Sequence, residues 1–142
     1  MGVEMKKTRT LIPTIVASLL LTTSGQFNAA AAPQLNPTIS SCTVIKEKGN
    51  KYRLTINGSY DAASKSDVAY KINGYRFELR NGGGQQLRDT GLISIAPTYA
   101  FNKTYDTYET QNFASNLKDV VFRVYNGDSL KGTATANCSK NF

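Results

Sequence analysis

The side chains that could carry out chemistry in this sequence are limited, because its 142 residues include no histidine and two cysteines. The lack of histidine excludes Ser-His-Asp and Cys-His nucleophiles, histidine general bases and histidine-containing metal sites. A disulfide between Cys42 and Cys138 would also exclude thiolate catalysis and zinc–sulfur sites. Carboxylate chemistry remains, but a glycosidase needs two carboxyl groups about 5–10 Å apart, and the acidic residues here occur singly along the chain. The sequence therefore predicts a protein that is not an enzyme.

Calcium is the one metal that this composition leaves open, since secreted β domains can bind it through loop oxygens. Asp61 and Asp67 flank one loop and Asp128 lies in a later turn, but the sequence has no DxDxDG-like series. Such residues are typical of turns in which the side chain hydrogen-bonds its own backbone. We therefore expect neither a metal site nor a cofactor.

Arginine and tyrosine side chains are the best candidates for a binding surface, because both are common in binding hot spots. Arg76, Arg80 and Arg88 are expected to leave the predicted sheet on its solvent-exposed face. Tyr108 and Tyr125 are the tyrosines that the hydrophobic pattern ties least to the core. The alternative for the arginines is a solvated sheet face with no partner.

Short β-strands must position these side chains. Residues 51–60 (KYRLTINGSY) alternate apolar and polar side chains, which predicts a strand with one buried and one exposed face. Residues 39–46 are predicted as the preceding strand, and further short strands are predicted over 92–95 and 98–105. The segment Asp106–Lys118 lacks this alternation and is expected to be a long polar connection with one helical turn near 113–117.

A meander is predicted over residues 68–89. A type I′ turn at Asn73-Gly74 would place Ile72 opposite Tyr75, Tyr70 opposite Phe77 and Val68 opposite Leu79. The alternative is a bulge at Gly74 within one long strand. A hairpin loop at Gly82-Gly83-Gly84 would place Leu79 opposite Leu87 and Glu78 opposite Arg88.

The closing hairpin, Asp119 to Cys138, has the same period-2 alternation and puts Cys138 on its apolar face. A three-residue loop over 126–128 predicts the opposed pairs Val124–Leu130, Phe122–Gly132 and Val120–Ala134. Because Cys42 lies on the first predicted strand, a Cys42–Cys138 bond would join the first strand to the last.

These patterns predict an all-β fold, a small antiparallel β-sandwich of seven to nine strands. In architecture alone it resembles immunoglobulin-like and fibronectin-type sandwiches. The sequence departs from antibody domains in having no tryptophan and in a disulfide between the first and last strands.

The first residues are predicted to be a secretory signal peptide. A basic stretch precedes the apolar run at 11–21, and an alanine-rich cleavage site follows at 29–32. A membrane anchor is the alternative, but the apolar run is shorter than the ~20 residues that a span needs. The short Lys-Lys signal favours a bacterial origin. The predicted organisation is a signal peptide over 1–31, an extended leader over 32–38 and a single β-sandwich domain over 39–142.

Export has consequences for charge and for the cysteines. Removing residues 1–31 takes away three of 17 basic and one of 10 acidic side chains, which leaves a net charge of +5. A basic exported protein is attracted to anionic surfaces, although solubility alone is an equally good explanation of the charge. Two cysteines in an exported chain predict one disulfide, and the product is expected to be secreted or periplasmic.

The sequence thus predicts a secreted, non-enzymatic binding domain that engages an extracellular or envelope macromolecule, with an anionic polymer as one candidate, through a basic Arg/Tyr sheet face. No specific nucleic-acid recognition is expected, and the chain is not expected to span a membrane after signal cleavage. One alternative is a structural or self-assembling surface protein that adds strands at a sheet edge. Another is a small secreted effector, such as an inhibitor or toxin, acting through Asp106–Lys118.

Overall fold

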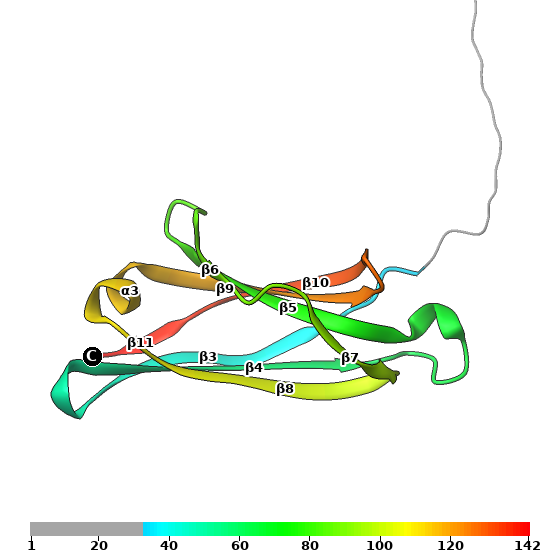
Figure 1. Cartoon of the computed structure of the whole chain (residues 1–142), viewed down its shortest axis with the longest axis horizontal. Coiled ribbons are helices and arrows are strands. Elements are labelled where there is room, and N and C mark those ends of the chain that lie inside the picture. Colours follow the sequence, from blue (N-terminus) through cyan, green and yellow to red (C-terminus); the bar gives the residue numbers. More distant parts are fainter. Residues whose placement is uncertain (1–32) are drawn as a thin grey trace, which may run out of the picture. The chain divides into compact units, whose positions relative to one another are not determined.

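The computed structural model describes residues 33–142; the predicted signal peptide lies outside them. Two β-sheets are layered as in a sandwich (Figure 1). The five-stranded sheet contains β10 (Ser129–Asn137), β9 (Leu117–Asn126), β5 (Ile72–Asn81), β6 (Gln86–Asp89) and β7 (Ile93–Thr98). The four-stranded sheet contains β11 (Ser139–Asn141), β3 (Thr38–Glu47), β4 (Lys51–Asp61) and β8 (Ala100–Glu109). The helices of this region are α3 (Gln111–Asn116) and the 3₁₀ turns η2 (Lys48–Asn50) and η3 (Val68–Tyr70).

This architecture confirms the predicted mostly-β fold with two layered sheets, and its strand pairs are antiparallel except for β11 beside β3. Aromatic side chains fill the space between the sheets. Phe77 of β5 stacks on Phe122 of β9 with ring centroids 4.8 Å apart. From the other sheet, Phe101 and Tyr105 of β8 bring their rings to 6.1 Å from Phe122 and Phe77 respectively. The alternation predicted for residues 51–60 is also confirmed, since its four inward side chains are at most 3% exposed: Tyr52, Leu54, Ile56 and Tyr60.

Strand β5 corrects the predicted turn at Asn73-Gly74. The strand passes straight through this dipeptide, and Gly74 and Tyr75 pair with Tyr125 and Val124 of β9. A type I′ turn needs a positive φ at both central residues, and neither has one. The register of β5 with β7 shifts between Ile72 and Gly74, so the alternative of a bulge in one long strand is the correct one.

The two predicted hairpins exist, but each has a different register. In the β5–β6 hairpin, Glu78 lies opposite Asp89 and Leu79 opposite Arg88, one residue away from the predicted pairing, because a bulge follows Leu79.

In the β9–β10 hairpin, Gly127 takes a left-handed φ of 60° and closes a two-residue turn, with Ser129 opposite Asn126. A bulge between Leu130 and Gly132 then places Gly132 opposite Val124. Leu130, predicted on the apolar face, is consequently 51% exposed.

The segment Asp106–Lys118 is not the long connection that the sequence predicted. Strand β8 continues to Glu109, α3 follows, and β9 begins at the fully buried Leu117. The helical turn was predicted correctly in kind, although α3 begins two residues earlier. Thr110 caps this helix, because its hydroxyl oxygen accepts a hydrogen bond from the Phe113 backbone N–H.

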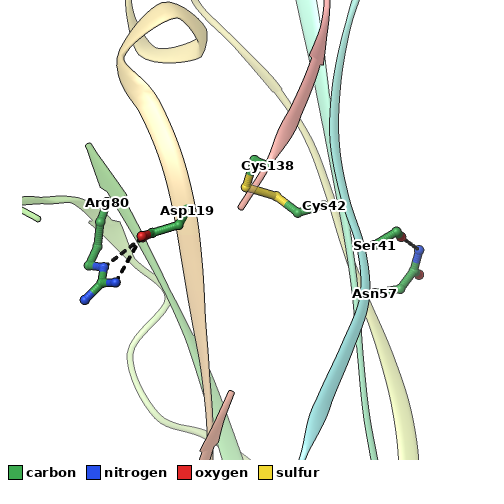
Figure 2. The surroundings of a disulfide bond; sticks show 6 residues. All are labelled: Ser41, Cys42, Asn57, Arg80, Asp119 and Cys138. Carbon is green, nitrogen blue, oxygen red and sulfur yellow. Dashed lines mark hydrogen bonds and ion pairs between the residues drawn. A yellow bond between two sulfur atoms is a disulfide. The ribbon is translucent and has the colours of Figure 1, made fainter. Parts of the chain in front are cut away.

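The predicted Cys42–Cys138 disulfide is confirmed (Figure 2). Cys42 lies on β3, and Cys138 stands between β10 and β11, where the chain passes from the five-stranded to the four-stranded sheet. The Cys138 backbone N–H also donates to the Lys118 carbonyl oxygen at 2.8 Å. The disulfide therefore fixes the place at which the chain crosses between the sheets.

The predicted leader contributes to the core. Leu35 is 3% exposed and forms a parallel bridge with Gly132 of β10. A Cβ atom on residue 132 would lie 2.3 Å from the Leu35 carbonyl oxygen, so this close backbone approach requires a glycine. Among residues 33–142, no helix is both long and apolar enough to cross a membrane.

Candidate functional site

Every arginine of residues 33–142 lies against a carboxylate. The five ion pairs are Arg53–Asp106, Arg76–Asp89, Arg80–Asp119, Arg88–Glu109 and Arg123–Glu78. Four of them engage two guanidinium nitrogens with two carboxylate oxygens, the geometry that makes such pairs strong and directional. The arginines of residues 33–142 are therefore committed to internal contacts.

Two of the predicted binding arginines share the outer face of the five-stranded sheet. Arg76 lies 2.5 Å from Asp89 and Arg80 lies 2.8 Å from Asp119, measured between nitrogen and oxygen. The hydrogen bonds that each guanidinium donates to its carboxylate raise the pKa of the guanidinium further above its ordinary value. Arg123 and Glu78 complete the row, 2.9 Å apart. Figure 2 shows the Arg80–Asp119 pair on the side of β9 turned away from the disulfide.

Three arginines and three carboxylates thus occupy this face, so its charges balance. Burial opposes ionisation of Asp89, but hydrogen bonds from Arg76 and the Gly91 backbone N–H outweigh it and hold the pKa of Asp89 below its ordinary value. The carboxylate therefore stays charged at neutral pH. The basic face that the sequence predicted is a neutral ion-pair ladder.

Arg88 lies elsewhere, which corrects its predicted position beside Arg76 and Arg80. Its register opposite the buried Leu79 turns it toward the other sheet. There its Nη2 donates to Glu109 Oε1 at 2.7 Å, and its guanidinium carbon lies 4.5 Å from the centre of the Phe113 ring. The Glu109 side chain is 4% exposed and the Arg88 side chain 39%, so this pair links the two sheets with its carboxylate buried and its guanidinium partly exposed.

The two candidate tyrosines are on opposite sheets. Tyr125 lies on β9 opposite Gly74, in the five-stranded sheet. Tyr108 lies on β8 in the four-stranded sheet and is 52% exposed. Its hydroxyl donates to Glu47 Oε1 at 3.1 Å, and this bond raises the pKa of Tyr108. The five residues predicted to bind a partner therefore do not form one surface.

The excess positive charge of the domain is carried by lysines. Residues 33–142 contain nine lysines, five arginines and nine acidic residues, and the arginines are all paired. Five of the nine lysines lie on the β3–β4 turn, at the α3–β9 junction and on β11, segments that meet at one end of the domain (Figure 1). We call this region the lysine end, and it consists of Lys46, Lys48, Lys51, Lys118 and Lys140.

Two hollows open at the lysine end. The first, of about 650 Å³, is the amide hollow, lined by Asn81, Gly82, Gly83, Ser115, Asn116, Leu117, Lys118, Asn137, Cys138 and Lys140. The second, of about 570 Å³, is the tyrosine hollow, lined by Lys46, Glu47, Lys48, Lys51 and Tyr108. In the tyrosine hollow, the Lys51 ammonium lies 5.3 Å from the centre of the Tyr108 ring. All five lysines of this end line one hollow or the other.

Sequence reasoning found Tyr108 in this region but missed the lysines. Three of them fall within six residues around one turn, Lys46 to Lys51, which is a local signal. Lys118 and Lys140 are far apart in the chain, and tertiary contacts bring them to the same end. Lys140 lies opposite Val44 in the β11–β3 pairing, and its ammonium donates to the carbonyl oxygen of Ser115 in α3 at 2.8 Å.

Other chemistry finds little support in the described residues. Within residues 33–142, no group of three His, Cys, Asp or Glu side chains is placed to hold a metal ion. The chain matches no protein-family model, and its sequence matches no curated protein. The chemistry that the described residues do offer is the positive charge of the lysine end.

Proposed function

We propose that this chain is a secreted, non-enzymatic interaction domain that binds an anionic extracellular or envelope polymer through its lysine end. One observation carries the proposal: the arginines of residues 33–142 are neutralised by internal pairs, and five of the nine lysines line two hollows at one end of the domain. Unpaired positive charge gathered in one place attracts a polyanion far better than the same charge spread over a surface.

The location and fold type belong to the same proposal. A disulfide, here between the buried Cys42 and the partly buried Cys138, favours an oxidising compartment, outside the cell or in a periplasm. The layering of two sheets of short, mainly antiparallel strands supports an immunoglobulin-like or fibronectin-like sandwich. Function does not follow from such a fold, so the proposal depends on the charge distribution.

Substitution of three lysines tests this function. We expect Lys46→Gln/Lys48→Gln/Lys51→Gln to elute from immobilised heparin at lower salt than the unsubstituted domain, because the tyrosine hollow loses its cations. Binding of the unsubstituted domain should weaken about tenfold between ~50 and ~200 mM salt, since exposed charges are screened over that range. The measurement is salt-gradient elution together with a dissociation constant at each salt concentration.

A matched control removes the same charge elsewhere. Lys71→Gln/Lys103→Gln/Lys131→Gln changes three lysines outside the lysine end and should elute close to the unsubstituted domain. Equal shifts for both triple variants would mean that net charge alone is responsible. A domain that heparin does not retain at low salt would refute the proposed function.

A second function, self-assembly by strand addition, is favoured by β8. This strand has ten residues, contains no proline and pairs with β4 without a register shift, and it is the last strand on its side of the sheet. A long, regular edge of this kind is a template for another strand. Self-assembly predicts a larger apparent mass as concentration rises in sizing chromatography, and Thr104→Pro in the middle of β8 should abolish the increase. A concentration-independent monomer excludes it.

A further inference from the structure

The lining of the amide hollow is positive. Lys118 from β9 and Lys140 from β11 contribute ammonium groups, and none of the lining residues described above is acidic. The tyrosine hollow differs, because Glu47 lies among its lysines. An anion entering the amide hollow therefore meets no carboxylate from the lining.

The hydrogen-bonding groups of the amide hollow are only partly used by the protein. The Oδ1 atom of Asn81 already accepts from the backbone N–H groups of Gly83 and Gln85 at 2.9 Å each. The Nδ2 atom of Asn116 donates to the Asn112 carbonyl at 2.9 Å, while its Oδ1 receives no donor from residues 33–142. Neither end of the Asn137 amide has a partner within that same range. The hollow thus offers free carbonyl oxygens as well as free N–H and ammonium donors.

This mixture restricts the ligand. A free carbonyl oxygen can only accept, so it is useful to a ligand that brings O–H or N–H donors. A simple phosphate or sulfate ester chain satisfies the lysines but brings no donor to the Asn116 and Asn137 oxygens, which are exposed and would keep their water. A sugar unit with a carboxylate or sulfate satisfies both kinds of group, and a volume of about 650 Å³ falls within the usual range for small-ligand sites.

The walls of the hollow are held in place before any ligand arrives. Cys138 is fixed by the disulfide and by its hydrogen bond to the Lys118 carbonyl. The Lys140 ammonium anchors β11 to α3 through Ser115. Such preorganisation lowers the entropy cost of binding.

We propose that the amide hollow binds an acidic saccharide unit, with Lys118 and Lys140 facing its anionic group and the Asn116 and Asn137 amides facing its hydroxyls. The proposal rests on the anion-binding function above and specifies the ligand chemistry of one hollow at the lysine end. The occupant is therefore one sugar unit of an acidic polysaccharide.

Three probes of related structure test this ligand. Oligogalacturonate carries hydroxyls and carboxylates, its methyl ester carries the hydroxyls alone, and polyphosphate carries charge alone. We expect the domain to bind oligogalacturonate more tightly than either of the others in calorimetric titrations. The variant Lys118→Gln/Asn137→Ala should bind oligogalacturonate about tenfold more weakly, as expected for loss of one charge-assisted and one neutral hydrogen bond.

The control variant, Lys103→Gln/Asn102→Ala, makes the same chemical changes on β8 and should bind oligogalacturonate like the unsubstituted domain. Amide NMR spectra of each variant establish that the fold is retained. The saccharide proposal is overturned if polyphosphate and oligogalacturonate bind equally well, or if the Lys118/Asn137 variant keeps its affinity for oligogalacturonate. Retention of the domain on heparin would in that case still support the proposed function. If heparin does not retain the unsubstituted domain at low salt, both proposals are overturned.

Discussion

Removal of the Cys42–Cys138 disulfide is expected to lower the free energy of unfolding by about 2–5 kcal/mol. The two cysteines are 96 residues apart, so the bond restricts nearly the whole domain in its unfolded state. The chain-entropy estimate for a loop of that length is about 4.7 kcal/mol, and measured values usually lie below it. This is a large share of the 5–15 kcal/mol that typically stabilises a domain.

Urea unfolding of Cys42→Ala/Cys138→Ala beside the oxidised domain measures this effect. The midpoint should fall, and the denaturant dependence should rise, because the unlinked chain exposes more surface when it unfolds. Dithiothreitol should move the oxidised domain toward the variant and leave the variant itself unchanged. If the variant were as stable as the oxidised domain, the prediction would be wrong. The disulfide would then add nothing to the free energy of unfolding that the packing of the domain provides.

The disulfide and the two faces of β4 could be predicted because neither depends on which strands pair with each other. Period-2 alternation assigns the side chains of a strand to two faces whatever the strand pairs with, and Tyr52 and Leu54 were placed correctly for that reason. Two cysteines leave only one intramolecular pairing. Neither inference required knowledge of the neighbouring strand.

The predicted turn at Asn73-Gly74 was wrong because it was based on the dipeptide alone. This dipeptide favours a hairpin, but β9 offers β5 a partner along Gly74 to Asn81 and thereby keeps the strand extended. The Leu92 side chain also lies over Gly74, 3.0 Å from where a Cβ atom would be. Glycine at this position therefore serves close packing within a strand, and that need arises from residues distant in sequence.

The charge of the predicted binding face could not be predicted for the same reason. Arg80 and its partner Asp119 are 39 residues apart, and Arg123 and Glu78 are 45 residues apart. The arginines counted along β5 and β6 suggest a basic face. The charge is balanced only when the carboxylates are placed beside them, among them Asp119 of β9. A single bulge after Leu79 then determined that Arg88 turns inward. The net charge was available from composition, but its position required the pairing of the strands.

Replacement of Arg88 by methionine is expected to cost about 3 kcal/mol of unfolding free energy. The change keeps much of the apolar stem but leaves the Glu109 carboxylate, 4% exposed, without its charged partner. Breaking a buried ion pair from one side is strongly destabilising because the remaining charge is not compensated. Such changes cost about 3–5 kcal/mol. We expect the low end of this range because the Arg88 side chain is 39% exposed, so water can reach part of the site.

The double variant Arg88→Met/Glu109→Leu distinguishes this cause from a general loss of packing. Replacing both partners removes the isolated charge, so most of the lost stability should return, and a double-mutant cycle gives the coupling energy of the pair. Arg53→Met is the matched control, because its pair with Asp106 has similar geometry on the exposed face of the four-stranded sheet, and it should cost much less. If the double variant were no more stable than Arg88→Met, the Phe113 contact and the stem of Arg88 would account for the loss. The link between β6 and β8 would then depend on packing, with the ion pair contributing little.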